Sequence, residues 1–440
     1  MAEGSAARRL AALALAEVRQ GRALPEALKN ARDKAPAISN ADVAFARRMA
    51  AQVLQQRSLL DARVQPALQR PPKPAWVREL VLVGLVQLED PDCPDHAAVA
   101  ATVGAAPAKL RGLVNAILRK AGRGQLPAPD SGKPVDVQAR QAGLPIWLYQ
   151  RLSADWGEQL PAVIEGSRQT PPWGLRLNLQ KTTQADYLQQ WPEDLQAPRP
   201  LGAAGLVLPR PGELRQLPGF EQGWVSVQNP SAQQAATLLP LQPGMKVLDA
   251  CAAPGGKTAH LLELEPQLNL TALDRDAQRL ADVRRGLERL GLNARCVASD
   301  LLQFEESGWD AILLDVPCSA TGILRRHPDI RWLRRSADIA ALVKQQSALL
   351  EHAWSLLKPG GVLIYASCSI LRAETVDVVQ AFLRAHPQVQ ADSLQLPAGE
   401  WVAPGWRIRP GGDWDGFFYA RLRQCAESSN PPTNGEVEAA

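Results

Sequence analysis

The sequence predicts an α/β protein in which a parallel-sheet domain follows an all-helical domain and a small α+β domain. From Gly244 onward, strand-like and helix-like segments alternate, as in a parallel sheet with crossover helices. A turn of small residues at 249–258 joins the first strand of that region to its first helix. In the first 122 residues, by contrast, apolar side chains recur at helical spacing.

The length of 440 residues favours two or three domains. A stretch rich in glycine and proline, from Gly122 to Pro134, is typical of a linker, and the end of the chain has little to bury. We expect a helical domain at 1–122, a linker at 123–137, an α+β middle domain at 138–235, the sheet domain at 236–423 and a disordered tail at 424–440.

Composition narrows the class of protein. With 46% hydrophobic residues the chain can bury substantial cores, which excludes a wholly disordered protein. Its six cysteines form no CxxC pair, which favours a reducing compartment. No apolar run approaches the roughly 18 residues of a membrane span, and no spacing of ligand residues matches a metal site. We expect a cytoplasmic monomer without membrane contact and without a metal.

The net charge of +4 is unevenly distributed. Residues 1–126 hold 19 Lys and Arg against 11 Asp and Glu, so the remainder of the chain is acidic. A basic helical domain suits a polyanion such as RNA, although an ordinary solvated helical surface would give the same count.

In the sheet domain, five strands are expected at 245–248, 268–273, 294–299, 309–314 and 362–366. Four carboxylates fall at the ends of the first four strands: Asp249, Asp274, Asp300 and Asp315. Because open α/β sheets bind ligands at the carboxyl ends of their strands, we expect these side chains around one ligand site.

The turn after the first strand is suited to a nucleotide-type cofactor. Its small residues would let a ligand approach the peptide groups and the start of the next helix. The turn matches neither a Walker loop nor a GxGxxG dinucleotide loop. Asp274, 19 residues after Gly255, is placed to accept hydrogen bonds from ribose hydroxyls. The residues of the turn that carry almost no side chain are Ala252, Ala253, Gly255 and Gly256.

The strand pattern at the C-terminal end distinguishes between the classes of cofactor that such a sheet could bind. Segments 406–410 and 417–422 are strand-like and are joined by a loop containing three glycines. A closing hairpin after five strands is typical of the Rossmann-like class I S-adenosylmethionine-dependent methyltransferase sheet, whose last strand inserts antiparallel, and not of an NAD dehydrogenase.

Two cysteines, Cys318 and Cys368, each follow an apolar strand. A thiolate that adds to carbon 6 of a pyrimidine makes carbon 5 able to accept a methyl group. Cysteine suits this step because it is strongly nucleophilic and a fair leaving group. The residues alone do not rank the two thiols.

Four motifs carry a resemblance to a known family: DACAAPGGKT at 249–258, DVPCSATG at 315–322, RRHPDIRW at 325–332 and SCS at 367–369. They resemble the bacterial Sun/Fmu family of RNA cytosine carbon-5 methyltransferases. HAAV at 96–99 and GLVNAILR at 112–119 resemble the NusB-like RNA-binding helical domain. The three domains in one chain are similar to the members of the family that methylate 16S ribosomal RNA.

The resemblance implies specific roles. The residues that correspond to the family's cofactor-binding loop are Cys251, Ala252, Ala253, Pro254, Gly255, Gly256 and Lys257. Cys368 would be the nucleophile, and Cys318 would assist product release. Asp274 would hold the ribose, Asp300 would lie beside the adenine, and Asp315 would lie near the methyl donor and the target base. S-adenosyl-L-methionine is the implied cofactor and RNA the implied partner.

Some interpretations stay open. The arginines Arg325, Arg326 and Arg331, close to His327 and Trp332, could grip RNA phosphates or stack on a base, or could belong to a solvated loop. Asn229 stands where the family has aspartate after Gln228. A tRNA cytosine methyltransferase and a non-catalytic NusB-type assembly factor remain alternatives.

Overall fold

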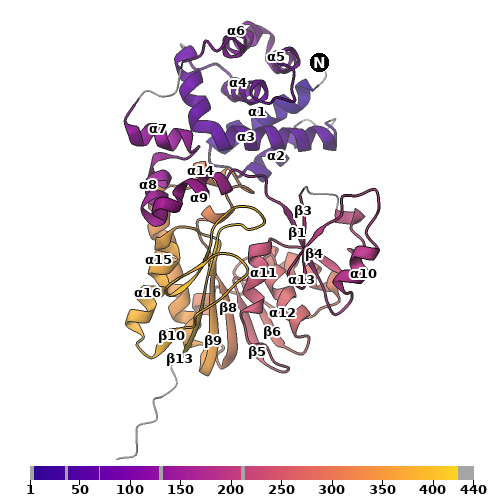
Figure 1. Cartoon of the computed structure of the whole chain (residues 1–440), viewed down its shortest axis with the longest axis vertical. Coiled ribbons are helices and arrows are strands. Elements are labelled where there is room, and N and C mark those ends of the chain that lie inside the picture. Colours follow the sequence, from indigo (N-terminus) through magenta and orange to yellow (C-terminus); the bar gives the residue numbers. More distant parts are fainter. Residues whose placement is uncertain (1–3, 35–37, 69, 128–131, 210–213, 425–440) are drawn as a thin grey trace, which may run out of the picture.

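The computed structural model describes residues 4–34, 38–68, 70–127, 132–209 and 214–424. A layer of helices lies at one end, the large sheet at the other, and a small sheet beside the large one (Figure 1). Of the predicted tail, residues 425–440 lie outside the described residues, and Gln424 ends the last strand. None of the described helices is both long enough and apolar enough to cross a membrane.

The N-terminal layer is helical, as predicted. Its helices are α1 (Ser5–Arg19), α2 (Leu24–Asp33), α3 (Asn40–Val64), α4 (Trp76–Leu88), α5 (Asp95–Ala105) and α6 (Arg111–Gly122). Helix α4 is mostly apolar and is buried along nearly its whole length, and α1, α3, α5 and α6 pack against it. At Gly84 a Cβ atom would lie 2.7 Å from Leu118, so glycine allows the close approach of α4 and α6.

Three further helices cross from the helical layer to the large sheet: α7 (Pro134–Gln141), α8 (Ile146–Trp156) and α9 (Leu160–Gly166). Helix α7 begins inside the predicted linker. Helices α8 and α9 share a core with Leu324, Ile339, Ile370 and Leu371 of the sheet domain. Helices α8 and α9 therefore pack on the sheet domain, and the small sheet follows them in the chain.

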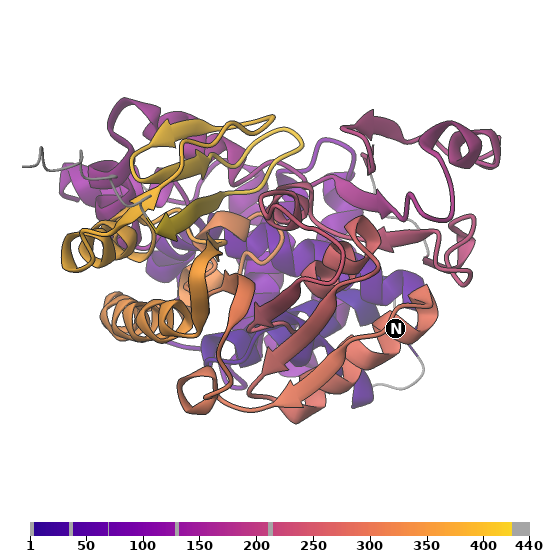
Figure 2. The same cartoon turned by 90° about the horizontal axis from the view of Figure 1, so that it is seen from below.

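The small sheet is antiparallel with strand order β2-β3-β1-β4 and is separate from the large sheet (Figure 2). Its elements are β1 (Trp173–Leu177), α10 (Gln184–Gln189), β2 (Arg199–Leu201), β3 (Gly205–Leu208) and β4 (Val225–Val227). Four strands and a short helix give this region the α+β character expected for the middle domain.

The large sheet has the order β11-β12-β13-β9-β8-β5-β6-β7, with β10 paired to β13. Its strands are β5 (Lys246–Ala250), β6 (Asn269–Asp274), β7 (Arg295–Ala298), β8 (Trp309–Asp315), β9 (Leu357–Ser367), β10 (Val389–Ala391), β11 (Glu400–Val402), β12 (Gly405–Ile408) and β13 (Phe417–Gln424). Strands β5 to β9 are parallel, and β13 inserts antiparallel between β12 and β9. The predicted closing hairpin is confirmed.

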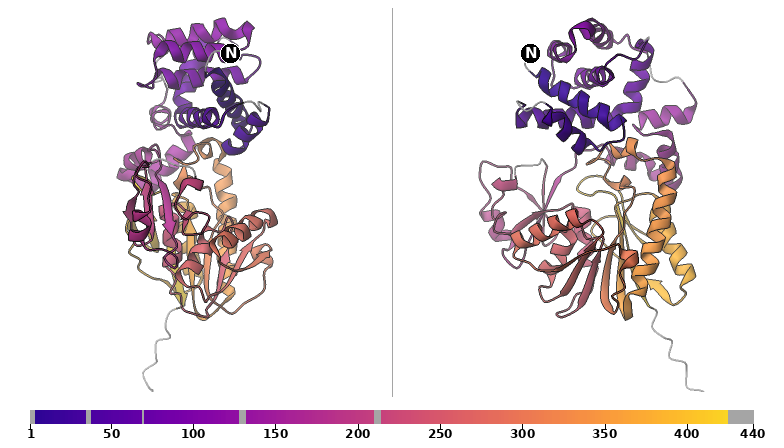
Figure 3. Two further views of the ribbon diagram at one scale, coloured as in Figure 1. Left: turned by 90° about the vertical axis from the view of Figure 1, so that its right-hand side faces the viewer. Right: turned by 180° about the vertical axis from the view of Figure 1, so that it is seen from behind.

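Helices cover both faces of this sheet (Figure 3). One face packs on α11 (Pro230–Thr237), α12 (Gly256–Leu264) and α13 (Ala277–Leu290). The other packs on α15 (Ser336–Ser355) and α16 (Val376–Ala385). The carboxyl ends of the parallel strands point toward the helical layer, where short α14 (Ile330–Leu333) contacts α1 (Figure 1).

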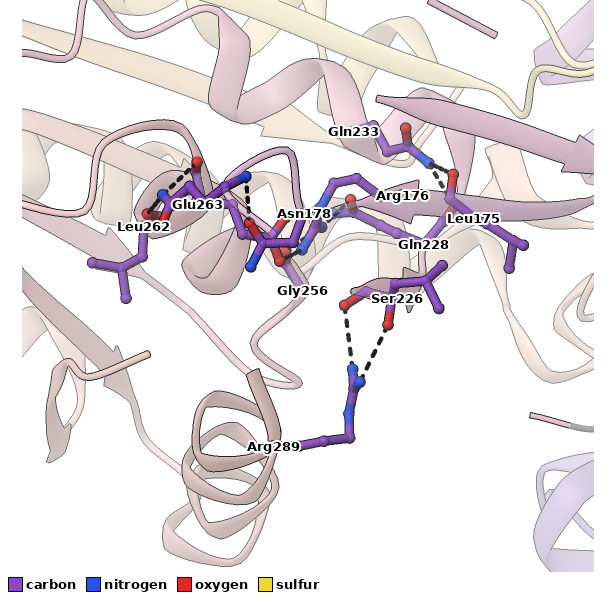
Figure 4. Close-up of polar contacts among 12 residues, drawn as sticks. Leu175, Arg176, Asn178, Ser226, Gln228, Gln233, Gly256, Leu262, Glu263 and Arg289 are labelled. Atoms are coloured by element: carbon purple, nitrogen blue, oxygen red, sulfur yellow. Dashed lines mark hydrogen bonds and ion pairs between the residues drawn. The ribbon is translucent and has the colours of Figure 1, made fainter. Parts of the chain in front are cut away.

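A buried ion pair attaches the small sheet to the cofactor turn (Figure 4). Arg176 of β1 is 1% exposed and donates Nε and Nη2 to the carboxylate of Glu263 on α12, at 2.7 and 2.8 Å. Its Nη1 donates to the carbonyl of Gly256 at 2.8 Å and to Gln228. Arg289 of α13 reaches Ser226 of β4. The small sheet is thus fixed against the helix that begins at the turn.

Candidate active site

A cavity of about 250 Å³ opens at the carboxyl ends of β5, β6, β8 and β9. Most of the expected ligand-binding side chains line it, although they come from segments far apart in sequence. The lining residues are Cys251, Ala253, Leu273, Asp274, Arg275, Arg279, Ser299, Asp300, Leu301, Asp315, Val316, Pro317, Cys318, Ala320, Gln345, Leu349 and Cys368. The structure therefore brings both thiols and three of the four strand-end carboxylates to one cavity.

Backbone strain concentrates at this cavity. Cys251 and Ala320 have φ angles of 63° and 61°, in the left-handed region that side chains with a Cβ rarely adopt. Among the described residues they are the non-glycine residues with positive φ, and both line the cavity. Such conformations persist where the surrounding structure holds them and are enriched at functional sites.

One glycine of the turn, Gly255, also has a role in helix packing. Gly255 is left-handed (φ 95°) and caps α12, and an added Cβ atom would lie 3.0 to 3.3 Å from Val283 of α13. Glycine is needed there for helix packing, whereas Cys251 and Ala253 form the wall of the cavity. Ala252, Pro254, Gly255, Gly256 and Lys257 belong to the turn but not to the lining.

Asp274 and Asp300 line the cavity and keep part of their hydrogen-bonding capacity free. Asp274 is buried and accepts backbone N–H bonds from Ala253 at 3.0 Å and from Asp276 at 2.9 Å. Asp300 accepts the N–H of Leu302 at 2.9 Å. Each carboxylate oxygen has a further lone pair, so both residues keep acceptor capacity for hydroxyl or amino groups.

The fourth strand-end carboxylate, Asp249, does not reach the cavity, which corrects the expectation for this residue. It is fully buried beneath the turn and accepts the hydroxyl of Thr258 at 2.6 Å. Its second oxygen has no hydrogen-bond partner among the described residues. Burial raises the pKa of Asp249 to about 7, against the opposing effects of Thr258 and Lys257.

Lys257 and Asp315 form an ion pair at the wall of the cavity. The Nζ atom of Lys257 donates to Asp315 at 2.5 Å and lies 5.8 Å from the ring centroid of Phe417. Burial works against the ammonium charge, but the carboxylate of Asp315 outweighs it and raises the pKa of Lys257. The site thus keeps a fixed cation within the electrostatic reach of Cys368.

The two thiols are hydrogen-bonded partners. Cys368 directly follows β9, Cys318 lies three residues after β8, and their Sγ atoms are 3.3 Å apart. With Cys368 as donor, this bond lowers the pKa of Cys318, opposed by burial and by Glu374. The same bond, together with burial, raises the pKa of Cys368, whereas Lys257 lowers it. The pair favours one shared negative charge over two.

The arginine-rich segment after Cys318 is not an RNA grip, nor is it a solvated loop. Arg325 is fully buried and, with Arg326, donates to the buried carboxylate of Asp415. Arg331 is 1% exposed and donates to the carbonyl of Ser167 at 2.7 Å. Burial lowers the pKa of Arg331 to about 9.

The same segment docks the helical layer. The indole N–H of Trp332 donates to the carbonyl of Leu54 on α3 at 2.7 Å. Asp329 accepts the N–H of Leu24 at the start of α2 at 3.0 Å. Asn229, which stands where the family has aspartate, caps α11 and donates its side-chain amide to Asp415. The asparagine therefore has hydrogen-bond partners for both ends of its amide group. Both expectations for the arginines are therefore wrong, because their partners lie in distant segments.

Sequence reasoning missed Arg275, Arg279 and Glu374. The first two line the cavity, and Arg279 donates to the carbonyl of Ala253 at 2.7 Å. The signal for them was their position just after the strand that ends at Asp274. Glu374 is fully buried between the two thiol-bearing loops. Only the folded arrangement reveals it, since its partners lie 5 to 55 residues away.

The cavity fits S-adenosylmethionine by the chemistry of its lining. Three carboxylates suit ribose hydroxyls, an adenine amino group and a positively charged sulfonium. Leu273, Leu301 and Leu349 supply apolar surface for a flat ring. Within the described ranges, no group of three or more His, Cys, Asp or Glu side chains could hold a metal ion.

The strand order and this cavity place the chain among the S-adenosylmethionine-dependent methyltransferases, which bind their cofactor at the carboxyl ends of such a sheet. Family models resolve the class further. Residues 236–423 match the 16S rRNA methyltransferase RsmB/F model, residues 5–123 the NusB family, and residues 144–215 the ferredoxin-like domain of RsmF/B-like methyltransferases.

Proteins of similar sequence match this chain along nearly its whole length. A protein of Xanthomonas campestris named ribosomal RNA small subunit methyltransferase B is 42% identical over 97% of this chain and 98% of its own length. One of the same name from Cronobacter sakazakii is 40% identical over 94% and 98%. The crystal structure of PH0851 has the same fold, with a TM-score of 0.79, 23% identity and coverage of 96% and 99%. The chain belongs to the RsmB/F family of 16S ribosomal RNA methyltransferases, which confirms the resemblance seen in its motifs.

Proposed function

We propose that this protein methylates carbon 5 of a specific cytosine in 16S ribosomal RNA through a covalent cysteine adduct. The observation that carries the proposal is the pair of thiols, 3.3 Å apart, in the same cavity as Asp274, Asp300 and Asp315. A methyl transfer to oxygen or nitrogen would need no second nucleophile, whereas carbon 5 of a pyrimidine must first be activated by addition at carbon 6.

In the proposed reaction, the Cys368 thiolate forms a bond to carbon 6, and the ring's electron density moves to carbon 5. Asp315, held by Lys257, is placed to hydrogen-bond the pyrimidine edge. The cofactor, when bound, supplies the electrophilic methyl group. Once the proton of Cys318 has passed to water, its thiolate takes the proton from carbon 5. The electrons of that carbon–hydrogen bond restore the ring double bond, and the bond from Cys368 breaks.

The assignment of the two thiols rests on the family resemblance, since their mutual hydrogen bond raises the pKa of Cys368 and lowers that of Cys318. Two nearby charges act in the opposite direction. The ammonium of Lys257 lowers the pKa of Cys368, and Glu374 opposes ionisation of Cys318. A pyrimidine that enters the cavity and separates the sulfur atoms would remove the bond that raises the pKa of Cys368. The thiolate is the reactive form.

The RNA would be bound by more than one part of the chain. Five cations on and beside α6 are exposed: Lys109, Arg111, Arg119, Lys120 and Arg123. They fit a phosphate backbone, in agreement with the NusB-type match. The target base must leave its stack because neither face is reachable inside a helix. We further propose the domain division 1–122, 138–235 and 236–423 and a cytoplasmic, monomeric enzyme.

The test uses two substitutions with opposite expected results. Cys368→Ala should abolish methylation, whereas Cys318→Ala should accumulate a covalent protein–RNA adduct visible on a denaturing gel. Wild-type protein should also be trapped by RNA that contains 5-fluorocytosine, because fluorine cannot leave as a proton does. A fully active Cys368→Ala variant would overturn the role assignment.

Bisulfite sequencing of RNA from a deletion strain and its parent would identify the substrate. Loss of one 5-methylcytosine in 16S ribosomal RNA is expected. Loss in tRNA instead would favour a tRNA enzyme, and binding of cofactor with no methylation of any RNA would favour an assembly factor.

A further inference from the structure

Glu374, the last residue of the short 3-10 helix η7 (Arg372–Glu374), is fully buried between the loops that carry the two thiols. Its carboxylate accepts four hydrogen bonds. One oxygen accepts the N–H of Ser319 at 2.8 Å and the amide of Gln346 at 3.1 Å. The other accepts the hydroxyl of Ser369 at 2.7 Å and the hydroxyl of Ser319.

Two of these partners are the residues that directly follow the cysteines in sequence. Ser319 directly follows Cys318, and Ser369 directly follows Cys368. The loops are also joined by the N–H of Gly322, which donates to the carbonyl of Cys368 at 2.8 Å. Glu374 is therefore a shared anchor for the two residues next to the thiols.

The anchor is costly to remove. Without its carboxylate, four buried donors would lose their acceptor, and an unpaired donor in the interior destabilises the fold. The negative charge of Glu374 also affects the pKa of Cys318. The hydrogen bond from Cys368 lowers the pKa of Cys318, and burial and the charge of Glu374 act against that lowering.

We propose that Glu374 is a positioning residue for the thiol pair: it sets the distance between the two sulfur atoms and disfavours the anion on Cys318 relative to Cys368. The proposal deepens the proposed function and rests on it for the roles of the thiols. It does not make Glu374 a group that contacts RNA or cofactor.

Two variants separate placement from charge. Glu374→Gln keeps an acceptor and similar volume but removes the charge, whereas Glu374→Ala removes the anchor. The matched control is Glu79→Gln, which removes a buried carboxylate that pairs with Arg57 inside the helical layer. Thermal unfolding of all three variants measures the loss of stability that any buried carboxylate would cause.

The first readout is alkylation of the cofactor-free, RNA-free protein by iodoacetamide, with the modified peptides quantified by mass spectrometry. We expect the ratio of Cys318 to Cys368 alkylation to rise several-fold in Glu374→Gln and to stay unchanged in Glu79→Gln. An unchanged ratio in Glu374→Gln would overturn the charge effect, whatever RNA the enzyme methylates.

The second readout is single-turnover methyl transfer at saturating cofactor. Because a misplacement of about 1 Å can lower a rate about 10²-fold, Glu374→Ala should lose about 10²-fold in rate with unchanged cofactor affinity, and Glu374→Gln should lose less. A wild-type rate in folded Glu374→Ala would overturn the placement role. If the wild-type enzyme itself failed to methylate RNA, the proposed function would fail, and the alkylation ratio would still decide this inference.

Discussion

The segment between β8 and α15 uses its polar residues in two opposite ways. Its first part, residues 315–320 (the thiol half), lines the cavity and presents a carboxylate and a thiol to a ligand. Its second part, residues 325–332 (the docking half), buries its arginines and its tryptophan against distant segments. The comparison shows that charged motifs next to a reactive residue can serve assembly of the molecule instead of recognition.

The two halves differ because their polar side chains meet different hydrogen-bond and ion-pair partners. The thiol half meets Lys257 from one side and Glu374 from the other, and both leave Cys318 facing the cavity. The docking half meets Asp415, which receives Arg325, Arg326 and Asn229. Asp415 thereby joins the closing hairpin, α11 and the arginine segment beneath the helical layer.

The largest expected effect is on the docking half. Arg325→Leu should lower the free energy of unfolding by about 3–5 kcal/mol, because it removes one partner of a buried ion pair. Thermal or urea unfolding measures it, with exposed Arg285→Leu as the control. A change as small as that of the control would contradict the structural role of this arginine.

In the thiol half, Lys257→Met should lower the rate of methyl transfer about 10²-fold, since it removes a fixed charge that acts on developing charge in the cavity. Single-turnover kinetics measures this rate. Lys344→Met, an exposed lysine on α15, serves as the control. Equal rates for both variants would place Lys257 among the structural residues instead.

The third prediction concerns the buried carboxylate of Asp249. Unlike Asp415, which pairs with two arginines, Asp249 accepts a hydrogen bond from one hydroxyl. Because burial raises the pKa of Asp249 to about 7, its stabilising contribution is present below about pH 4 and is lost as the pH rises toward 7. The advantage of Asp249→Asn over wild type in unfolding free energy should grow by about 2 kcal/mol between pH 5 and pH 8. Urea unfolding at the two pH values measures it, and a constant difference would refute the buried, ionising carboxylate.

The smallest effect concerns the contact between layers. Trp332→Phe keeps most of the ring packing but removes the hydrogen bond to Leu54, so unfolding free energy should fall by about 1 kcal/mol. Trp401→Phe, at a 37% exposed tryptophan, is the control. If both variants unfold alike, the hydrogen bond between the layers adds nothing measurable.

Local patterns were sufficient to predict much of this molecule. Apolar strands ending in Asp274 and Asp315, a small-residue turn and a closing hairpin predicted the sheet and its cofactor class, because each signal lies within a few consecutive residues. Motifs around Cys318 and Cys368 predicted the family in the same way.

The sequence by itself determined which elements form and which chemical groups lie at the strand ends, since strand periodicity and turn composition are local properties. Only the tertiary structure decided what those groups do. It buried Asp249, turned Arg325 toward Asp415 and set Glu374 between the thiols, through contacts that span up to about 90 residues. Burial and pairing depend on which distant segments meet, and no local pattern encodes that.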